Sequence, residues 1–273
     1  MVRDMADDVL YALEDGGVAV LTLNRPERLN AWTGDLERQF FDYVDQCAED
    51  SDVKVIVVTG AGRGFCAGAD MDMLQGIGER GGQQRDAGPR RRTFHLLTVP
   101  KPVIAAINGA CAGIGMVQAL MTDIRFAAKG AKFTSAFARR GLIAEHGMSW
   151  VLPKLIGPAR ALDVMLSARV FLAEEAAEMG LVNAVVEPDE LMNHTLAYAR
   201  DMAVNCSPAS LAAIKREVWT QLVGLSVEDA TALSDADMVH SLAAQDFKEG
   251  VASFVERRPP KFAPLERGWA TGD

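Results

Sequence analysis

Short runs of β-branched and apolar residues alternate along the chain with segments of helical periodicity. The predicted strands cover residues 18–23, 55–59, 103–107, 124–127 and 181–186, and turn residues bound each of them. Helical patterns lie between them at residues 35–48, 69–74 and 114–121. Because crossover helices join parallel strands in proteins of this kind, the alternation predicts an α/β domain with a mainly parallel sheet.

Strand signals stop after Val186, and the rest of the chain is a succession of helical patterns. These patterns cover residues 189–205, 208–222, 226–241 and 244–256. We therefore expect two regions: residues 1–190, which carry the sheet and the ligand site, and residues 191–273, a helical region for packing or oligomerisation.

The segment 76–92 differs from its surroundings because it is rich in glycine, basic and poor in apolar residues. This composition predicts a mobile loop or a loosely formed helix. Two roles stay open for it: a surface insertion without a ligand contact, or a lid beside a ligand site.

Charge and composition exclude several classes of function. The chain has 28 Lys and Arg residues against 37 Asp and Glu residues, a net charge of −9, whereas nucleic-acid-binding proteins carry a basic surface. Its four cysteines are widely spaced, which indicates neither a disulfide framework nor a metal site. No basic segment leads into an apolar one at the N-terminus, and no apolar run reaches the ~18 residues of a membrane span. We expect a cytoplasmic protein with no nucleic-acid or membrane partner.

Two glycine-rich turns, at residues 60–70 and 108–116, each follow a predicted strand and precede a predicted helix. The first lacks the Gly-Lys-Ser/Thr ending of a phosphate-binding loop, and the spacing of the second differs from the dinucleotide-binding fingerprint. Backbone N–H groups at helix starts are free to bind acceptors, so two such turns can direct two donors at one oxygen atom. The alternative is that the glycines only allow close packing of strand against helix.

Five segments resemble the enoyl-CoA hydratase/isomerase (crotonase) family in their order and spacing. They are residues 25–31, 64–70, 102–109, 127–133 and 173–181, the last followed by Val185, and the resemblance runs from Val18 to Phe262. It implies an α/β fold, a crotonase-like spiral of β-β-α turns with a C-terminal helical oligomerisation region, and a homotrimer or hexamer. It also implies an acyl-CoA substrate, with coenzyme A as part of the substrate and no separate cofactor.

The resemblance also implies roles for individual residues. The thioester oxygen would accept hydrogen bonds from the N–H groups of Ala69 and Ile114, which together form an oxyanion hole. The residues implied for binding the CoA moiety are Arg28, Cys66, Ala67, Gly68, Asp70, Met71, Gly113, Phe254 and Lys261, the last two possible contacts to a neighbouring subunit. The residues implied for the acyl channel are Met73, Leu74, Val117, Phe137 and Trp150. The alternative for these groups is that the cations are solvated and the apolar residues belong to the core.

The sequence departs from the family pattern where hydratases of this family carry two glutamates. Val117 and Phe137 occupy these positions, and neither side chain can transfer a proton. A carboxylate remains nearby at Glu145, placed like the single catalytic acid of Δ3,Δ2-enoyl-CoA isomerases. The apolar residues 142–144 predict a desolvating setting that suits a general base. The alternative is an acid that only stabilises the N-terminus of the helix beginning at Met148.

Three functions follow as hypotheses. In the first, Glu145 moves a proton between two carbons of an acyl-CoA through an enolate held in the oxyanion hole, which shifts a 3-enoyl double bond to the 2-position. In the second, the protein is a 2-enoyl-CoA hydratase of the fatty acid β-oxidation type, and Glu145 organises water with or without His146. In the third, the protein binds acyl-CoA without catalysis. Asp70 and Asp72 resemble a metal pair, but a helix-start role suits them better because no third ligand is in view.

Overall fold

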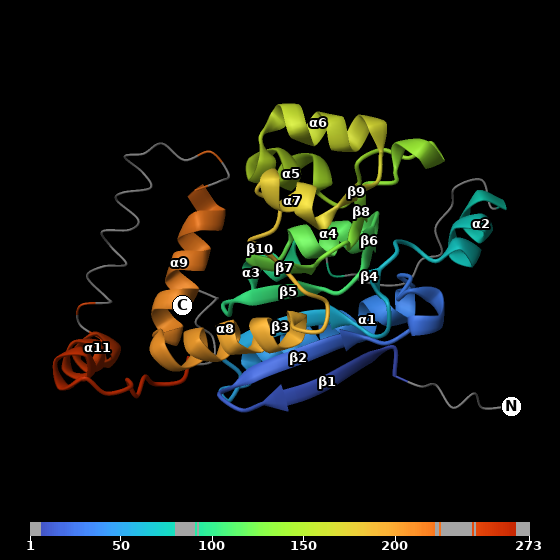
Figure 1. Ribbon diagram of the computed structural model, residues 1–273. Helices are drawn as coiled ribbons and strands as arrows, with labels where there is room; N and C mark the ends of the chain where they lie inside the picture. The colour runs from blue at the N-terminus through green and yellow to red at the C-terminus, as the bar shows by residue number, and fades with distance from the viewer. Residues whose placement is uncertain are drawn as a thin grey trace, which may run out of the picture.

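Six strands form the larger of two β-sheets in the computed structural model, which describes residues 7–79, 91, 93–221, 224, 242 and 244–265. They are β1 (Val9–Glu14), β2 (Val18–Leu23), β3 (Val55–Gly60), β5 (Val103–Ile107), β7 (Ile124–Ala128) and β10 (Ala184–Val186), side by side in this order (Figure 1). β1 is antiparallel to β2, and every other neighbouring pair is parallel. The predicted parallel sheet is therefore confirmed, with an antiparallel strand added at one edge.

Four short strands form the smaller sheet, in the order β4 (Gly64–Cys66), β6 (Ala110–Ala112), β8 (Lys132–Thr134) and β9 (Phe171–Leu172). β4, β6 and β8 pair in parallel, and β9 is antiparallel to β8. Each of the three parallel strands directly follows a long strand of the larger sheet. The helices α2 (Met71–Glu79) and α4 (Ile114–Leu120) then follow β4 and β6. The chain thus repeats a β-β-α unit, which is the expected spiral.

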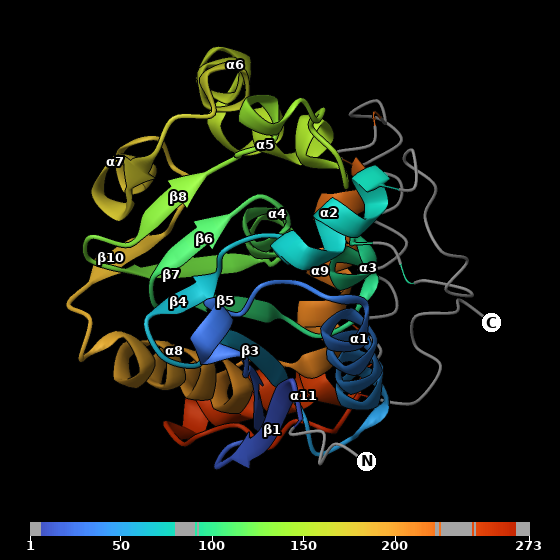
Figure 2. The same cartoon turned by 90° about the vertical axis from the view of Figure 1, so that its right-hand side faces the viewer.

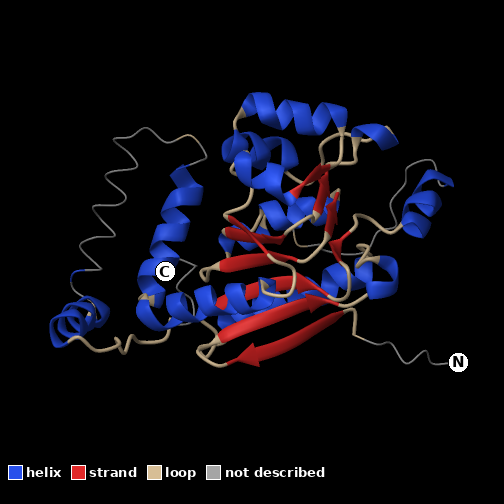
Figure 3. Ribbon diagram, viewed as in Figure 1, coloured by secondary structure: helices blue, strands red, loops and turns tan. Residues whose placement is uncertain are grey.

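Two long helices, α1 (Gly34–Glu49) and α8 (Leu191–Asn205), cover opposite faces of the larger sheet, and Figure 3 shows the strands enclosed by helices. The side chains of β2 divide between the two faces: Val18 and Val20 pack with α8, and Ala19 packs with α1. A strand buried on both faces is apolar throughout, which explains the unbroken apolar run of the sequence. The division predicted at residue 190 stays a prediction.

The other described helices are α3 (His95–Thr98), α5 (Met148–Ile156), α6 (Pro158–Ser167), α7 (Ala173–Glu178), α9 (Pro208–Gln221) and α11 (Gln245–Glu256), with 3-10 turns at η1 (Pro26–Arg28) and η2 (Ala138–Arg140). α5, α6 and α7 lie together beyond the smaller sheet, at the top of Figure 1. Within the described parts of the chain, no helix has the length and apolar character that a membrane crossing needs.

A buried lysine ties α9 to the core of the molecule. Nζ of Lys215 lies 2.8 Å from Oδ2 of Asp123 and donates to the carbonyl oxygens of Leu96 (2.8 Å) and Lys101 (3.0 Å). Trp219, one turn later on α9, donates from Nε1 to the other oxygen of Asp123 at 3.1 Å. Burial lowers the pKa of Lys215, and the Asp123 carboxylate acts in the opposite direction. These contacts fix the position of α9 against the loops that precede β5 and β7.

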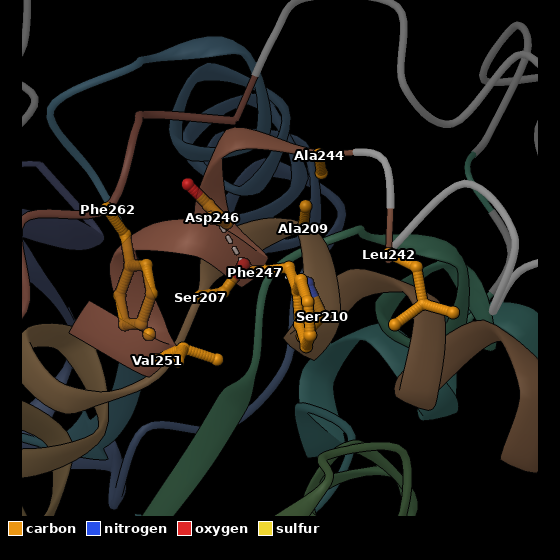
Figure 4. Close-up of a pocket in the computed structure, with 10 residues that line it drawn as sticks. Ser207, Ala209, Ser210, Leu242, Ala244, Asp246, Phe247, Val251 and Phe262 are labelled. Atoms are coloured by element: carbon orange, nitrogen blue, oxygen red, sulfur yellow. Dashed lines mark hydrogen bonds between the residues drawn. The ribbon is translucent and has the colours of Figure 1, made fainter. Parts of the chain in front are cut away.

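The last described helix, α11, lies at the left edge of the molecule in Figure 1, away from both sheets, and behind β1 in the view of Figure 2. A cavity of about 570 Å³ separates it from the start of α9, and Phe247, Val251 and Phe262 are among the residues that line it (Figure 4). Ser207 donates a hydrogen bond to Asp246 at 2.5 Å, which links the two helices. The predicted helices at 189–205, 208–222 and 244–256 are confirmed within the described residues, whereas the one at 226–241 lies outside them.

Two predicted boundaries are wrong. The strand predicted at 181–186 begins only at Ala184, because the amides of Leu181 (2.8 Å) and Val182 (3.4 Å) donate to the carbonyl oxygen of Ala176 and close α7. The helix predicted at 69–74 begins at Met71 and continues to Glu79, so residues 76–79 of the segment predicted as a loop or a loosely formed helix are helical. Residues 80–90 and 92 of this segment lie outside the described residues.

Candidate active site

The two glycine turns predicted from the sequence lie side by side. Their strands, β4 and β6, are neighbours, and Cys66 pairs with Cys111 across them. Gly68 has φ 108° and Gly113 has φ 51°, which are backbone angles that favour glycine. A Cβ atom on Gly113 would lie only 3.7 Å from Cα of Gly68, so the two turns are in contact. The spiral therefore brings the starts of α2 and α4 to one place.

The amides of Ala69 and Ile114 both point away from the hydrogen bonds that hold these turns. Trp32 forms a parallel bridge with Ala69: its N–H donates to the oxygen of Gly68 (2.8 Å), and its oxygen accepts from Asp70 (3.0 Å). In such a bridge the N–H of the central residue is directed to the opposite side. Ile114 is the first residue of α4, where an N–H group has no acceptor within the helix. Both donors are thus available to a ligand beside the turns.

Close packing of α4 against β4 holds the second donor in place. A Cβ atom on Gly115 would lie 2.3 Å from the carbonyl oxygen of Cys66, which no real structure tolerates. Burial also raises the pKa of the Cys66 thiol to about 12 and that of Cys111 well above its usual value, so both sulfurs stay protonated. These cysteines serve as small packing residues and not as nucleophiles.

We expect Gly115→Ala to lower the free energy of unfolding by about 1–3 kcal/mol, because the added methyl group forces α4 away from β4. Activity should fall as well, since Ile114 moves with the helix. The measurement is urea denaturation followed by circular dichroism. Gly250→Ala is the matched control: this glycine is also helical, but its added Cβ would lie 3.7 Å from Phe262, so the protein should gain up to about 1 kcal/mol. Equal stability of Gly115→Ala and wild type would contradict the close approach.

Two asparagines that the sequence analysis missed hold the first turn. The side chain of Asn30 is fully buried, and its amide donates to the oxygens of Ala61 (3.0 Å) and Gly64 (2.7 Å). Asn108 donates to Gly60 (2.8 Å) and accepts from the N–H of the same residue (3.2 Å). The sequence marks Asn108 by its place directly after the apolar run 103–107, whereas Asn30 ends a mostly polar stretch and carries no such signal.

Glu145 lies in the loop between η2 and α5, which two contacts tether to the rest of the site. The hydroxyl of Thr93 donates to the carbonyl oxygen of His146 at 2.8 Å. A Cβ atom on Gly147 would lie 3.0 Å from Cε of Met121, at the C-terminal end of α4. The carbonyl oxygen of Glu145 accepts from Met148, the first residue of α5, at 3.0 Å. The carboxylate is thus carried by a loop that packs on α4.

The carboxylate of Glu145 is more exposed to solvent than its apolar sequence neighbours predict. The side chain of Glu145 is 36% exposed, and its Oε2 lies 3.5 Å from Nε2 of His146. Two of its three apolar neighbours are exposed, Leu142 to 39% and Ile143 to 79%, whereas Ala144 packs against the core. The expected desolvation is therefore only partial in the described chain, because residues adjacent in a loop direct their side chains to different sides.

Val117 and Phe137, which the resemblance aligns with the two hydratase glutamates, are both buried. Val117 lies on α4 and is fully buried, and Phe137 precedes η2 with 8% exposure. Val117 also donates its N–H to the oxygen of Gly113 at 3.0 Å. Neither side chain carries a group that can transfer a proton.

The residues suggested for the CoA moiety gather mainly around η1 and α2. Arg28 is 57% exposed and pairs with Asp72 at 3.4 Å. Asp70 is bound by Arg25 at 3.1 Å and accepts from the amide of Asp72 at 3.1 Å, so it serves the start of α2. Cys66 and Gly68 are buried, Ala67 is half-buried, Met71 is 52% exposed, Lys261 is exposed, and the side chain of Phe254 lies outside what the structure describes.

The residues suggested for the acyl channel are spread over α2, α4, α5 and the residue before η2. Met73 and Leu74 are half-buried on α2, which projects from the molecule at the right of Figure 1. Trp150 on α5 is 36% exposed and has Nζ of Lys154 4.5 Å from the centre of its ring. The described residues contain no group of three or more His, Cys, Asp or Glu side chains that could hold a metal ion.

The structure is thus an α/β spiral of β-β-α units in which two glycine turns at helix starts meet. The model of the enoyl-CoA hydratase/isomerase family matches residues 14–264, and the chain belongs to this family. It is 36% identical to the 1,2-epoxyphenylacetyl-CoA isomerase of Escherichia coli, with 94% of this chain and 99% of that one covered. It is 35% identical to a probable enoyl-CoA hydratase of Mycobacterium leprae, with coverage of 98% and 94%.

Solved structures show the same fold. A probable enoyl-CoA hydratase/isomerase from Mycobacterium abscessus superposes with a TM-score of 0.87 at 33% identity, covering 95% of this chain and 100% of that one. An enoyl-CoA hydratase from Mycobacterium marinum is 52% identical, with a TM-score of 0.68 and coverage of 78% and 98%. The protein therefore has the crotonase fold and belongs to a family of enzymes.

Proposed function

We propose that the protein is an enoyl-CoA isomerase that shifts the double bond of a 3-enoyl-CoA thioester to the 2-position. The observation that supports the proposal is that the loop of Glu145 packs on α4. Val117 and Phe137, which the resemblance aligns with the two hydratase glutamates, are both buried and apolar. Isomerisation needs one proton-transfer group, whereas hydration normally needs a second group to hold the water. A relative named as an isomerase of a CoA thioester is consistent with this choice.

The reaction we propose moves one proton and gains or loses no atom. Glu145 takes a proton from carbon 2, and the electron pair of that C–H bond enters a dienolate whose charge rests on the thioester oxygen. The N–H groups of Ala69 and Ile114 bind this oxygen, and a donor of this kind typically lowers the barrier by about 3–4 kcal/mol. Return of the proton to carbon 4 restores the carbonyl group and leaves the 2-enoyl product.

We place the CoA moiety at the surface formed by η1 and the start of α2. The exposed pair of Arg28 and Asp72 is a weak ion pair that a ligand phosphate can displace. Met71 is exposed on the same helix, and the amides of residues 66–70 lie along the first turn. The chemistry needs no cofactor beyond the CoA of the substrate.

We further propose a homotrimer, or a hexamer of two trimers, built through the C-terminal helices. Phe247, Val251 and Val255 on α11 are 48%, 51% and 73% exposed, and apolar helix surface of this kind is typical of an interface. Lys261 would then approach the ligand of a neighbouring subunit. The cysteines of the chain are free, which is usual in the cytoplasm, where we place the protein.

A panel of 2-enoyl-CoA and 3-enoyl-CoA thioesters tests the reaction. We expect the absorbance of the conjugated enoyl thioester to rise with a 3-enoyl substrate. Falling absorbance of a 2-enoyl substrate, with ¹⁸O from labelled water in the product, would favour a hydratase instead. The contact of His146 with Glu145 at 3.5 Å is the observation in favour of that alternative. If the protein bound acyl-CoA but converted neither the 2-enoyl nor the 3-enoyl thioesters, it would be an acyl-CoA-binding protein without catalytic activity.

A further inference from the structure

One buried polar side chain in the described chain has no partner. Gln118, on α4, is 3% exposed, and neither Nε2 nor Oε1 of its amide makes a hydrogen bond. All other buried side-chain polar atoms of the described residues are paired. An unpaired buried amide is costly, and native proteins keep one where a water molecule or a ligand completes it.

The packing of α4 shows which way Gln118 points. Successive helix residues are about 100° apart, so Gln118 lies about 60° from Gly115 on one side and about 60° from Met121 on the other. Gly115 faces Cys66 of β4, and Met121 touches Gly147, as the contacts of their positions show. The amide is therefore directed between β4 and the loop that carries Glu145.

The tilt of helical side chains brings this amide closer to the site. A side chain on a helix leans toward the N-terminus and covers the preceding turn. For Gln118 that turn begins at Ile114, whose N–H is one of the two proposed oxyanion donors. The neighbouring side chains of Met116, Val117 and the C-cap residue Met121 are all apolar and buried, so Gln118 is the one polar group that α4 offers there.

We propose that Gln118 recognises a polar substituent on the acyl group, and that the substrate is a hydroxy- or oxo-substituted enoyl-CoA thioester. The inference rests on the proposed acyl-CoA reaction and narrows its substrate class. The side-chain amide of glutamine both donates and accepts hydrogen bonds. It can therefore donate to and accept from a hydroxyl group, and it can donate to a carbonyl oxygen. A site built to bind such a group discriminates against the analogue that lacks it, because its own amide is then left unpaired.

Gln118→Leu tests the proposal with 3-enoyl-CoA substrates of one chain length, unsubstituted or carrying a hydroxyl group at each carbon beyond carbon 4 in turn. We expect wild type to prefer one hydroxylated substrate by about tenfold or more in kcat/KM. The variant should lose this preference and favour the unsubstituted thioester. Gln46→Leu, the same change at an exposed position of α1, should keep the wild-type ratio.

An unchanged ratio in Gln118→Leu would overturn the proposal and leave the amide a structural group. Thermal unfolding is measured for each variant, and Gln118→Met, which keeps the side-chain length, replaces Leu if Leu lowers Tm. Calorimetry gives the Kd of a saturated acyl-CoA thioester and of its hydroxyl-substituted analogue. The ratio of these two Kd values measures the same preference without turnover. If no enoyl-CoA is turned over but Gln118→Leu removes a preference in Kd, the isomerase proposal fails and the recognition role of Gln118 stands.

Discussion

Replacing Glu145 with Gln is expected to lower kcat for a 3-enoyl-CoA thioester by about 10³-fold. General acid–base catalysis typically contributes 10²–10⁴-fold, and here one carboxylate both removes and returns the proton. The amide of Gln keeps the size of the side chain but cannot take the proton. Turnover is measured by the rise in absorbance of the conjugated product. Kd for a saturated acyl-CoA should stay within about threefold of wild type, because the backbone donors remain.

The control for this prediction is Glu178→Gln, the same substitution at an exposed position of α7, which should leave kcat unchanged. His146→Gln separates the two reactions, since a hydratase that uses both side chains would lose activity in this variant as well. If Glu145→Gln kept more than half of the wild-type turnover, the carboxylate would be an acid that only stabilises the start of α5. The isomerase proposal would then be lost.

The long elements of the fold could be predicted because each is buried along its length. β5 (Val103–Ile107) has all of its residues buried and begins and ends where the apolar run does. α1 shows a stripe of Leu36, Phe40 and Val44 at helical spacing, and Thr33 caps its start by accepting from Leu36 at 3.1 Å. In such segments local pattern and tertiary packing favour the same structure.

The strands of the smaller sheet could not be predicted from their pattern, because three residues are too few to show a period of two. β4 is Gly64–Cys66, which the sequence shows only as part of a glycine-rich turn. β1 was also missed: residues 9–13 are all apolar, but residues 10, 12 and 13 of this edge strand are exposed, so its apolar run does not mark a buried strand. Edge and short strands depend on neighbours that are far away in the sequence.

The candidate site, too, could be predicted only where it depends on local sequence. The positions of the two glycine turns could be read from the sequence, because a left-handed φ at Gly68 and at Gly113 demands glycine. Their contact could not, since it depends on the pairing of β4 with β6. The exposure of Glu145 was also out of reach, because the directions of side chains in a loop follow from its backbone and not from the polarity of its neighbours.

The second large effect is expected for Ile114→Pro, which removes one proposed oxyanion donor without removing the helix. Proline is favourable at the first position of a helix, where its missing N–H breaks no helical hydrogen bond. Gly113, with φ 51° and ψ −124°, lies outside the α region that a following proline disfavours. Loss of a single donor should lower kcat by about 10²–10³-fold. The measurement is turnover of the 3-enoyl-CoA under saturating substrate.

Ile114→Val is the matched control, because valine has as many side-chain carbons as proline but keeps the N–H group. Its kcat should stay close to wild type, and both variants should unfold at similar Tm if the helix start is intact. Similar turnover of the two variants would contradict the role of this amide. The double variant with Glu145→Gln should lose less than the product of the single effects, because both groups serve the formation of one enolate and neither is effective without the other.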